Sequence, residues 1–476
     1  MSRTTITLLE EQRRALRGLL FNDGSEHAAI VLLGRSSHID AWSGTQQERF
    51  FVAEVVPVPV EAFIERTPTR LTWSTTPFFR HLKIAMCRGL TLGVIHSHPS
   101  GPLAFSPEDD VADQELVQIT EDRLDGENWL VSMVMDDTGG IIARAYSTAE
   151  KTRAGAYAVH ETSMLCVLGE RWTFRYPGRG RGVAGEELDR QVRAFGRAYT
   201  EDLRQLRIAI VGCGGTGSAV ALLLARIGVR HLALIDSDTV HGTNLNRLHF
   251  STRADANLQR RKVDVVGEGI ANLGMATTIL RYALPVDDPG CREVLVSCDV
   301  IFGCTDDHLG RNLLNRLAHF YYVPVIDMGL SIEPHPDRDG YAAFDGRVTV
   351  VQPGYPCQIC RKLIEPEIML AESQRRTDPA TYRERVRAGY IVGQAEPSPV
   401  VVTFTTELAA MAVNELFQRL NGYRGDGGSC TERVRRFNEV KDADVVPSGR
   451  SRPNCLLCGQ RKYDGRGDVK PFLDQT

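Results

Sequence analysis

The sequence predicts an α/β protein of two domains, and three observations carry this prediction. The chain has 476 residues, more than a single hydrophobic core usually serves. Runs rich in β-formers alternate with helical segments over its second half. A glycine- and arginine-rich stretch, 176–182, is typical of a linker. We therefore expect an N-terminal mixed α/β domain over 1–150, a linker over 151–185 and a C-terminal Rossmann-like, doubly wound sheet over 186–476.

Composition and charge indicate an ordinary globular protein. Hydrophobic residues make up 42% of the chain and charged residues 24%. The formal net charge of −4 gives no reason to expect nucleic acid or an anionic membrane as a partner. The longest apolar stretch, 218–227, is too short to span a membrane, and residues 1–20 predict an amphipathic helix rather than a secretory signal. We expect a cytoplasmic protein without a membrane or nucleic-acid partner.

The elements of each domain follow from local pattern. In the first domain, strands are predicted over 29–34, 49–59, 90–95, 129–135 and 141–146, with a helix over 78–87. Ser106 is expected to cap a helix that begins at Pro107, because a capping hydroxyl, a first-turn proline and acids follow in the preferred order. In the second domain, strands are predicted over 207–212, 231–236, 299–304 and 323–328, and a late helix over 399–420. Strands separated by helices predict a parallel sheet.

A metal-dependent hydrolytic site is predicted in the first domain. His96 and His98 stand one residue apart on an extended segment, so both imidazoles project to one face. Asp109, on the following helix, completes three protein ligands and leaves a fourth position for water, which is the arrangement of catalytic zinc. Such a site also needs a carboxylate to take a proton and a hydroxyl to stabilise an oxyanion.

These residues resemble the JAMM (MPN-plus) metalloprotease motif, in which a glutamate precedes His-x-His, seven residues and Ser-x-x-Asp. The resemblance implies a JAMM-like metalloprotease domain in which His96, His98 and Asp109 bind catalytic zinc and Ser106 is the oxyanion donor. It also implies that Glu26, just before the first strand, is the general base. Glu54 remains a reserve candidate for that role.

A phosphate-binding loop is predicted in the second domain. An apolar run leads into Gly212-x-Gly214-x-x-Gly217, and a helix follows. Glycines let the backbone approach phosphates at a helix N-terminus, and an acid about twenty residues later, here Asp236, can hold a ribose hydroxyl. This loop alone suits a nicotinamide-dependent oxidoreductase equally well.

The continuation favours a nucleoside triphosphate. Asn244 and Arg247 follow in one segment, then Lys262, and Asp306 closes a later strand. Cations around a phosphate loop can neutralise a departing pyrophosphate, and an aspartate there can hold Mg²⁺. A dehydrogenase has no use for this set.

The second domain resembles the adenylating domain of the ubiquitin-activating superfamily, which includes the bacterial activators ThiF and MoeB. The resemblance implies that AMP is joined from ATP to the C-terminal glycine of a small ubiquitin-like or sulfur-carrier protein. It also implies a homodimer in which Arg190 reaches the partner's active site. The implied nucleotide and Mg²⁺ site comprises Gly212, Gly214, Gly215, Gly217, Asp236, Asp238, Asn244, Arg247, Lys262 and Asp306. Arg260 or Arg261 stays open as a substitute for Lys262.

Two Cys-x-x-Cys pairs predict a structural zinc site. They are Cys357 with Cys360 and Cys455 with Cys458, and four thiolates make a closed tetrahedral site. Thioester-forming relatives carry a nucleophilic cysteine in the crossover that corresponds to 363–400, and this sequence has none there. Cys430 is the nearest remaining cysteine, and we expect no covalent thioester.

The leading hypothesis is therefore a two-activity enzyme. Its first domain hydrolyses after the C-terminus of the carrier, as a zinc-dependent peptidase or isopeptidase, and its second domain adenylates that C-terminus. One alternative keeps only the adenylation, with the first domain as a carrier-binding module. Another is a nucleotide-dependent oxidoreductase with an unrelated metal domain.

Overall fold

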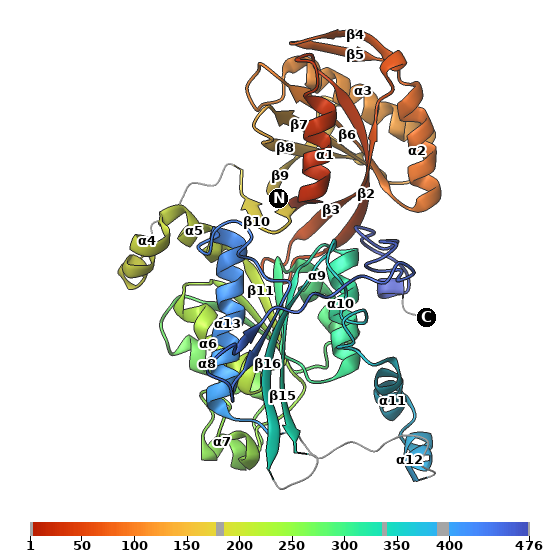
Figure 1. Ribbon diagram of the computed structural model, residues 1–476. Coiled ribbons are helices and arrows are strands. Elements are labelled where there is room, and N and C mark those ends of the chain that lie inside the picture. The colour runs from red at the N-terminus through yellow and green to blue at the C-terminus, as the bar shows by residue number, and fades with distance from the viewer. Residues whose placement is uncertain (1–2, 178–184, 336–339, 388–398, 475–476) are drawn as a thin grey trace. The chain divides into compact units, whose positions relative to one another are not determined.

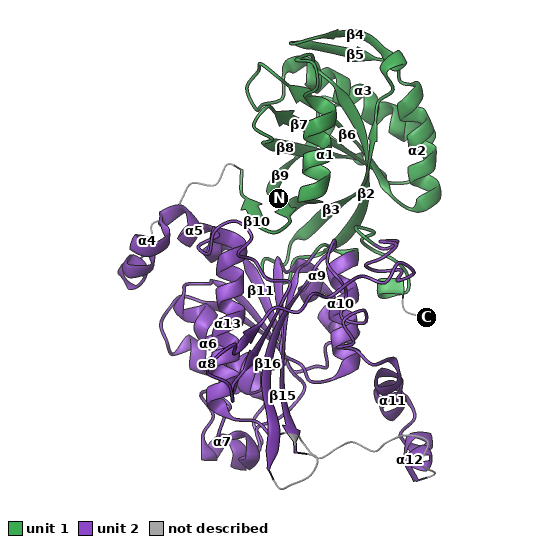
Figure 2. Ribbon diagram, in the orientation of Figure 1, with its two compact units in different colours: residues 1–180, 320–322, 464–476 green, residues 181–319, 323–463 purple. Residues whose placement is uncertain are grey.

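The computed structural model describes residues 3–177, 185–335, 340–387 and 399–474, and it divides the chain into two compact units. Figure 1 shows the elements in chain order, and Figure 2 shows the two units in different colours. Unit 1 comprises residues 1–180, 320–322 and 464–476, and unit 2 comprises 181–319 and 323–463. Unit 1 is therefore assembled from three separate stretches of sequence.

Unit 1 is a mixed sheet that closes on itself. Its strand order is β1-β3-β2-β6-β7-β8-β9-β10, and β1 pairs in parallel with both β3 and β9. A separate hairpin, β4 (Phe63–Thr67) and β5 (Arg70–Trp73), follows a short 3-10 turn at Val60–Ala62. The strands of the sheet are β1 (Arg3–Leu9), β2 (Ala28–Ile39), β3 (Gln46–Pro57), β6 (Thr91–His98), β7 (Trp129–Asp136), β8 (Ile141–Lys151), β9 (Tyr157–Leu168) and β10 (Trp172–Arg175).

Two apolar cores cover the two faces of this sheet. Helix α1 (Glu10–Leu20) packs on one face, where Ala29, Val31 and Leu33 of β2 point. Helices α2 (Thr76–Arg88) and α3 (Pro107–Arg123) pack on the other face, where the alternate residues of β2 point. Side chains in a strand alternate between faces, so each residue of β2 and β6 is assigned to one core.

Two expectations about unit 1 are corrected. Residues 1–20 do not form one helix, because Arg3–Leu9 is the strand β1 and only Glu10–Leu20 is helical. Pairing on both sides buries the β-branched residues of β1, and this tertiary burial overrides a local helical pattern. The predicted linker, 151–185, contains β9 and β10, so the sheet continues beyond residue 150. Of the glycine- and arginine-rich stretch, residues 178–182 lie outside the described residues.

Unit 2 has the predicted Rossmann-like architecture with an antiparallel extension. Strands β13-β12-β11-β14-β15 run parallel, and β16, β17 and β18 continue the sheet in antiparallel order. This extension was not predicted. The strands are β11 (Arg207–Val211), β12 (His231–Ile235), β13 (Thr278–Tyr282), β14 (Val300–Gly303), β15 (Val325–Pro334), β16 (Tyr341–Val351), β17 (Glu432–Arg436) and β18 (Asp444–Val445).

The strand order of unit 2 reverses between β11 and β14, because the chain moves outward through β12 and β13 before it returns to the other side of β11. Ligands of open α/β sheets bind at such a switch point, outside the carboxyl ends of the strands. The helices of the unit are α4 (Asp189–Phe195), α5 (Arg197–Gln205), α6 (Gly215–Arg226), α7 (Arg253–Asn257), α8 (Lys262–Ala271), α9 (Arg292–Ser297), α10 (His308–Phe320), α11 (Pro366–Thr377), α12 (Pro379–Arg387) and α13 (Val402–Asn421). Within the described ranges, no helix of either unit is both long and apolar enough to cross a membrane.

Candidate functional sites

Unit 1 brings the three predicted metal ligands together. His96 and His98 lie at the end of β6, and Asp109 lies in the first turn of α3. The Nε2 atom of His96 is 3.0 Å from Oδ1 of Asp109 and 3.1 Å from Nε2 of His98. Nε2 of His98 is 3.7 Å from Oδ2 of Asp109. One atom from each side chain thus lies within 4.8 Å of the other two, close enough to hold one ion.

A capping box fixes Asp109 at the start of α3. The Ser106 backbone N–H donates to Oδ2 of Asp109 at 2.7 Å, and the Asp109 backbone N–H donates to Oγ of Ser106 at 3.1 Å. Burial alone raises the pKa of Asp109, but hydrogen bonds from His96 and Ser106 and the charge of His96 outweigh it and hold the pKa well below its usual range. The carboxylate is therefore ionised, as a metal ligand must be.

The predicted oxyanion donor is engaged in the same motif. Oγ of Ser106 donates to Oδ2 of Asp109 at 2.9 Å. The predicted role of Ser106 toward a substrate requires this hydroxyl to turn away from the carboxylate.

The two candidate bases differ in their surroundings. Glu26 precedes β2, is 8% exposed, and lies near enough to the two histidines for their charges to act on it. Burial raises the pKa of Glu26, and the histidines oppose this rise. Glu54 is instead about half exposed, and its Oε2 pairs with Nη1 of Arg88 at 2.5 Å. Glu26 is thus buried near the histidine and aspartate cluster, whereas Glu54 pairs with an arginine at the surface.

In unit 2, the glycine loop follows β11 directly. Gly212 has φ of +89°, and a Cβ there would lie 2.6 Å from the carbonyl oxygen of Cys304. A Cβ on Gly217 would lie 1.8 Å from the carbonyl oxygen of Gly212. Only glycine fits these two positions. Gly214 is the N-cap of α6 and has open space around its Cα, so the helix N-terminus is accessible to a phosphate.

Asp236 holds this loop in place. One carboxylate oxygen accepts from the Cys213 backbone N–H at 2.6 Å, and the other accepts from the Asp238 backbone N–H at 2.8 Å. Burial raises the pKa of Asp236, although Lys262 opposes this. Nζ of Lys262 pairs with Oδ2 of Asp238 at 2.7 Å and lies 4.0 Å from Asp236. The predicted ribose-binding acid therefore also organises the loop.

The remaining predicted residues follow strands β12 and β14 in the chain. Arg247 lies beside the glycine loop, because a Cβ on Gly215 would meet its side chain at 3.3 Å. The side chain of Asn244 accepts from the backbone N–H of His241 at 2.9 Å and closes the turn before Arg247. Asp306 follows β14, is exposed, and makes no hydrogen bond or ion pair with the parts of the chain that the structure describes. It is open to a cation.

Arg190 lies apart from these groups. It is exposed on α4 and has no ion-pair partner among the described residues. Of the two predicted substitutes for Lys262, Arg260 pairs with Asp255 at 2.9 Å and with Glu268 at 2.6 Å. Arg261 is the N-cap of the helix that begins with Lys262. The Lys262 side chain lies near Asp236 and Asp238.

The four cysteines of the two predicted pairs converge in unit 2. Sγ of Cys357 is 3.7 Å from Sγ of Cys455, and Sγ of Cys458 is 3.5 Å from Sγ of Cys360. Bonds of about 2.3 Å from zinc in a regular tetrahedron place the sulfurs about 3.8 Å apart. Burial raises the pKa of Cys360, and Arg452, which donates to Sγ of Cys360 at 3.4 Å, opposes this rise. The donor set therefore fits a closed zinc site.

Sequence reasoning missed several groups around these sites. Glu372 of α11 accepts from the backbone N–H groups of His308 and Leu309, at the start of α10. Arg376 of α11 pairs with Asp307, the neighbour of Asp306. In unit 1, Arg144 is a charged residue in an apolar strand, and this contrast was the available signal.

The comparisons with known proteins agree with the architecture of unit 2. The ThiF family model matches residues 188–457, which is more than half of the chain. The chain belongs to the ThiF family.

The chain is also similar to proteins that are named as adenylyltransferases or as activating enzymes. The chain is 31% identical over 171 residues to the molybdopterin-synthase adenylyltransferase of Escherichia coli K12, covering 36% of this chain and 64% of that protein. It is 24% identical over 265 residues to the SAMP-activating enzyme E1 of Haloferax volcanii, and the match covers 55% of this chain and 84% of that protein. It is 28% identical over 187 residues to the adenylyltransferase and sulfurtransferase uba4 of Emericella nidulans, and the match covers 39% of this chain and 38% of that protein. The chain thus spans less than two thirds of the first and third of these relatives.

Proposed function

We propose that unit 2 joins AMP to the C-terminal glycine of a small ubiquitin-like or sulfur-carrier protein. The observation that carries this proposal is the set of charged residues at the switch point of a ThiF-family sheet. Arg247 and Lys262 lie beside the glycine loop, and Asp306, which has no partner among the described residues, follows β14. Two of the relatives are adenylyltransferases by name, and a third is an activating enzyme for SAMP. Family membership removes the ground for the oxidoreductase alternative, which rested on the glycine loop alone.

The chemistry follows from these positions. An oxygen of the carrier's terminal carboxylate forms a bond to the α-phosphorus of ATP, and the bond from that phosphorus to the bridging oxygen breaks. Pyrophosphate leaves with the electron pair. Arg247 and Lys262 neutralise its charge, and the α6 N-terminus binds phosphate oxygens through backbone N–H groups. Mg²⁺ held by Asp306 would add positive charge at the same phosphates.

The proposed assembly is a homodimer. Exposed Arg190 has no partner among the described residues, and in a dimer it would reach the nucleotide of the partner subunit. We propose that Arg190 binds phosphate there, as Arg247 and Lys262 do in their own subunit.

Pyrophosphate exchange tests the adenylation. Acyl-adenylate formation is reversible, so the chain should exchange labelled pyrophosphate into ATP only with a carrier that has a free C-terminal glycine. Asp306→Ala should abolish the exchange, and Glu26→Gln, in the other unit, should leave it unchanged. Exchange that persists undiminished in Asp306→Ala contradicts the assignment.

We further propose that unit 1 is a JAMM-type zinc hydrolase that cleaves after the carrier's terminal glycine. The convergence of His96, His98 and Asp109, with the buried carboxyl of Glu26 beside them, supports this reading. Zinc held by these ligands would lower the pKa of a water molecule toward neutrality. Glu26 takes the proton from that water and passes it to the leaving amine, and Ser106 donates to the developing oxyanion.

A carrier with a short C-terminal extension tests the hydrolase. The chain should remove the extension, and a chelator that strips the histidine site should stop the cleavage. If the extended carrier binds and is never cleaved, the alternative applies, in which unit 1 is a carrier-binding module.

A further inference from the structure

The proposed zinc ligands of unit 1 come from two different elements. His96 and His98 belong to a strand of the sheet, whereas Asp109 belongs to a helix that packs on that sheet. A shift of α3 against β6 would separate the carboxylate from the imidazoles. The structure must therefore contain a contact that fixes the start of α3 against the sheet.

Arg144 makes that contact. It lies in β8, in register with Ser132 of β7, which is itself in register with Val94, two residues before His96. The strand that carries Arg144 is thus bound through one intervening strand to the strand that carries the histidines. The Arg144 side chain is only 5% exposed, so its position is fixed by packing.

The guanidinium of Arg144 contacts two residues of α3 that follow Asp109 and one residue that precedes the helix. Its Nη1 pairs with Oδ1 of Asp110 at 2.5 Å, and its Nε donates to Oδ2 of Asp113 at 2.8 Å. Its Cζ stacks 3.8 Å from the ring centroid of Phe105, the residue before the helix cap. One planar cation therefore contacts the segment immediately before α3 and the first and second turns of α3.

Neighbouring groups hold the same arrangement. The hydroxyl of Tyr146, also in β8, donates to Oδ2 of Asp113 at 3.1 Å. The side chains of Tyr146 and Asp113 are buried, and Asp113 is 3% exposed as a residue. A buried ion pair with additional hydrogen bonds is geometrically specific, because leaving either charge unpaired is costly.

We propose that Arg144 is a positioning residue for the zinc site, because it fixes the start of α3 so that Asp109 meets His96 and His98. This inference rests on the proposed zinc site of unit 1. A lysine cannot replace the guanidinium fully, because an ammonium offers no planar fork for two carboxylates. The effect reaches the ion through Asp109 rather than through direct contact.

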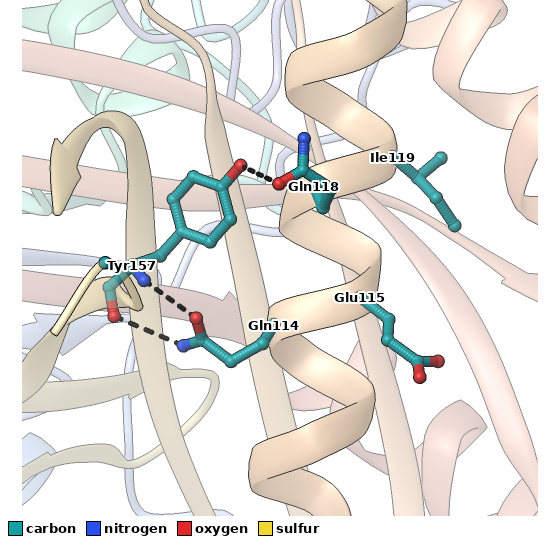
Figure 3. A pocket seen from close by; sticks show the side chains of 6 residues that line it. Gln114, Glu115, Gln118, Ile119 and Tyr157 are labelled. Atoms are coloured by element: carbon teal, nitrogen blue, oxygen red, sulfur yellow. Dashed lines mark hydrogen bonds between the residues drawn. The ribbon is translucent and has the colours of Figure 1, made fainter.

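The middle and the far end of α3 are held by separate contacts, which supply a control. Gln114 exchanges two hydrogen bonds with the backbone of Tyr157, at 2.7 and 3.2 Å, and the Tyr157 hydroxyl donates to Gln118 (Figure 3). Lys151 of β8 pairs with Glu121 near the end of α3 at 2.9 Å. This pair joins the same strand to the same helix as Arg144 does, but at the opposite end from Asp109.

Metal binding by the full chain tests the proposal. Wild type should bind two zinc ions, and Arg144→Ala should weaken one of them by about ten- to a hundredfold, the range that loss of a supporting contact usually causes. The four-cysteine zinc in the same chain is the internal standard and should not change. In protein loaded with Co²⁺, the visible absorption of the histidine site should change in Arg144→Ala, with an intermediate effect in Arg144→Lys.

The control and the alternative results separate the explanations. Lys151→Met should leave both metal affinities and the Co²⁺ spectrum unchanged. Equal weakening by Lys151→Met, or unaltered binding in Arg144→Ala, overturns the positioning role. Wild type that binds one zinc ion only, at the cysteines, instead overturns the proposed zinc site itself. If Arg144→Ala does not fold, Asp113→Asn, which keeps the volume of the side chain, is judged by the same criteria.

Discussion

The candidate sites of the two units hold their charged groups in different ways. In unit 1, the metal-site side chains contact one another and are only 11–17% exposed. In unit 2, Asp306 is exposed without a partner among the described residues, and Lys262 is paired with Asp238, whose side chain is 65% exposed. The first set already has the spacing that the proposed ion needs. In the second, the proposed binding of phosphate would require Lys262 to exchange its contact with Asp238 for a phosphate contact.

This difference decides what a substitution measures at each site. Where groups are assembled in advance on a strand and a capped helix, removal of one group changes chemistry or metal binding without a prior rearrangement. Where a cation is already paired, the free energy needed to break that pair reduces the free energy that it contributes to binding a ligand. The predictions below use this distinction, and they begin with the largest expected effect.

The general base of unit 1 should give the largest effect. Glu26→Gln should keep zinc bound, because Glu26 is not among the three proposed ligands, and should slow cleavage of a carrier extension by about a hundred- to ten-thousandfold. The matched control is Glu54→Gln, which should change little, since Glu54 pairs with Arg88 at the surface. Cleavage rates and bound zinc are measured together. If Glu54→Gln is the inactive variant, the assignment of the base is reversed.

The paired cation of unit 2 should give the next effect. Lys262→Met should lower carrier-dependent pyrophosphate exchange by about a hundred- to a thousandfold, as loss of one transition-state charge contact typically does. Asp238→Asn releases Lys262 from its partner, so the KM for ATP should fall or stay unchanged, whereas the nucleotide-site role that the family resemblance implies for Asp238 would make it rise. A strong rise of KM in Asp238→Asn would show that Asp238 itself holds the nucleotide or its cation.

The number of zinc ions bound per chain should fall by half when the histidine site is removed. The chain is expected to bind about two zinc ions, one held tightly by four cysteines and one more easily stripped from the histidine site. His96→Ala combined with His98→Ala should leave one. Cys357→Ser should weaken the other and lower thermal stability, because a structural zinc contributes folding free energy. Metal analysis that is unchanged in the double histidine variant contradicts the assignment.

The predictable part of the fold and sites was the part with a local period. A strand has a period of two, so His96 and His98 share a face, and the Ser106 cap fixes where α3 begins and hence where Asp109 lies. The glycine loop and the alternating strands likewise predicted the ThiF-type sheet. These features depend on neighbours within a few residues.

The parts that failed depend on distant residues. Strand β1 forms where a helix was predicted because it is inserted between β3 and β9, which are far apart in the sequence. Residues 320–322 and 464–476 belong to unit 1 through contacts with β3 and β2. The Tyr322 hydroxyl donates to the carbonyl of Val52, and Asp468 accepts from the backbone N–H of Ser37. The pairing of Lys262 with Asp238 also needs tertiary placement of two loops. No local pattern contains this information.

The smallest expected effect concerns Cys430, and it tests whether unit 2 stops at the adenylate. The backbone of Cys430 is bound on both sides, its N–H donating to Glu415 and its carbonyl accepting from Arg419. Burial, with the nearby charge of Glu415, raises the pKa of the Cys430 thiol, so the thiolate needed for attack on an acyl-adenylate is scarce at neutral pH. Because the anchoring groups are backbone atoms, Cys430→Ala should leave pyrophosphate exchange and stability nearly unchanged. Electrophoresis without reductant should show no carrier adduct of the wild-type chain. A thiol-sensitive adduct that disappears in Cys430→Ala would show that this cysteine is a nucleophile.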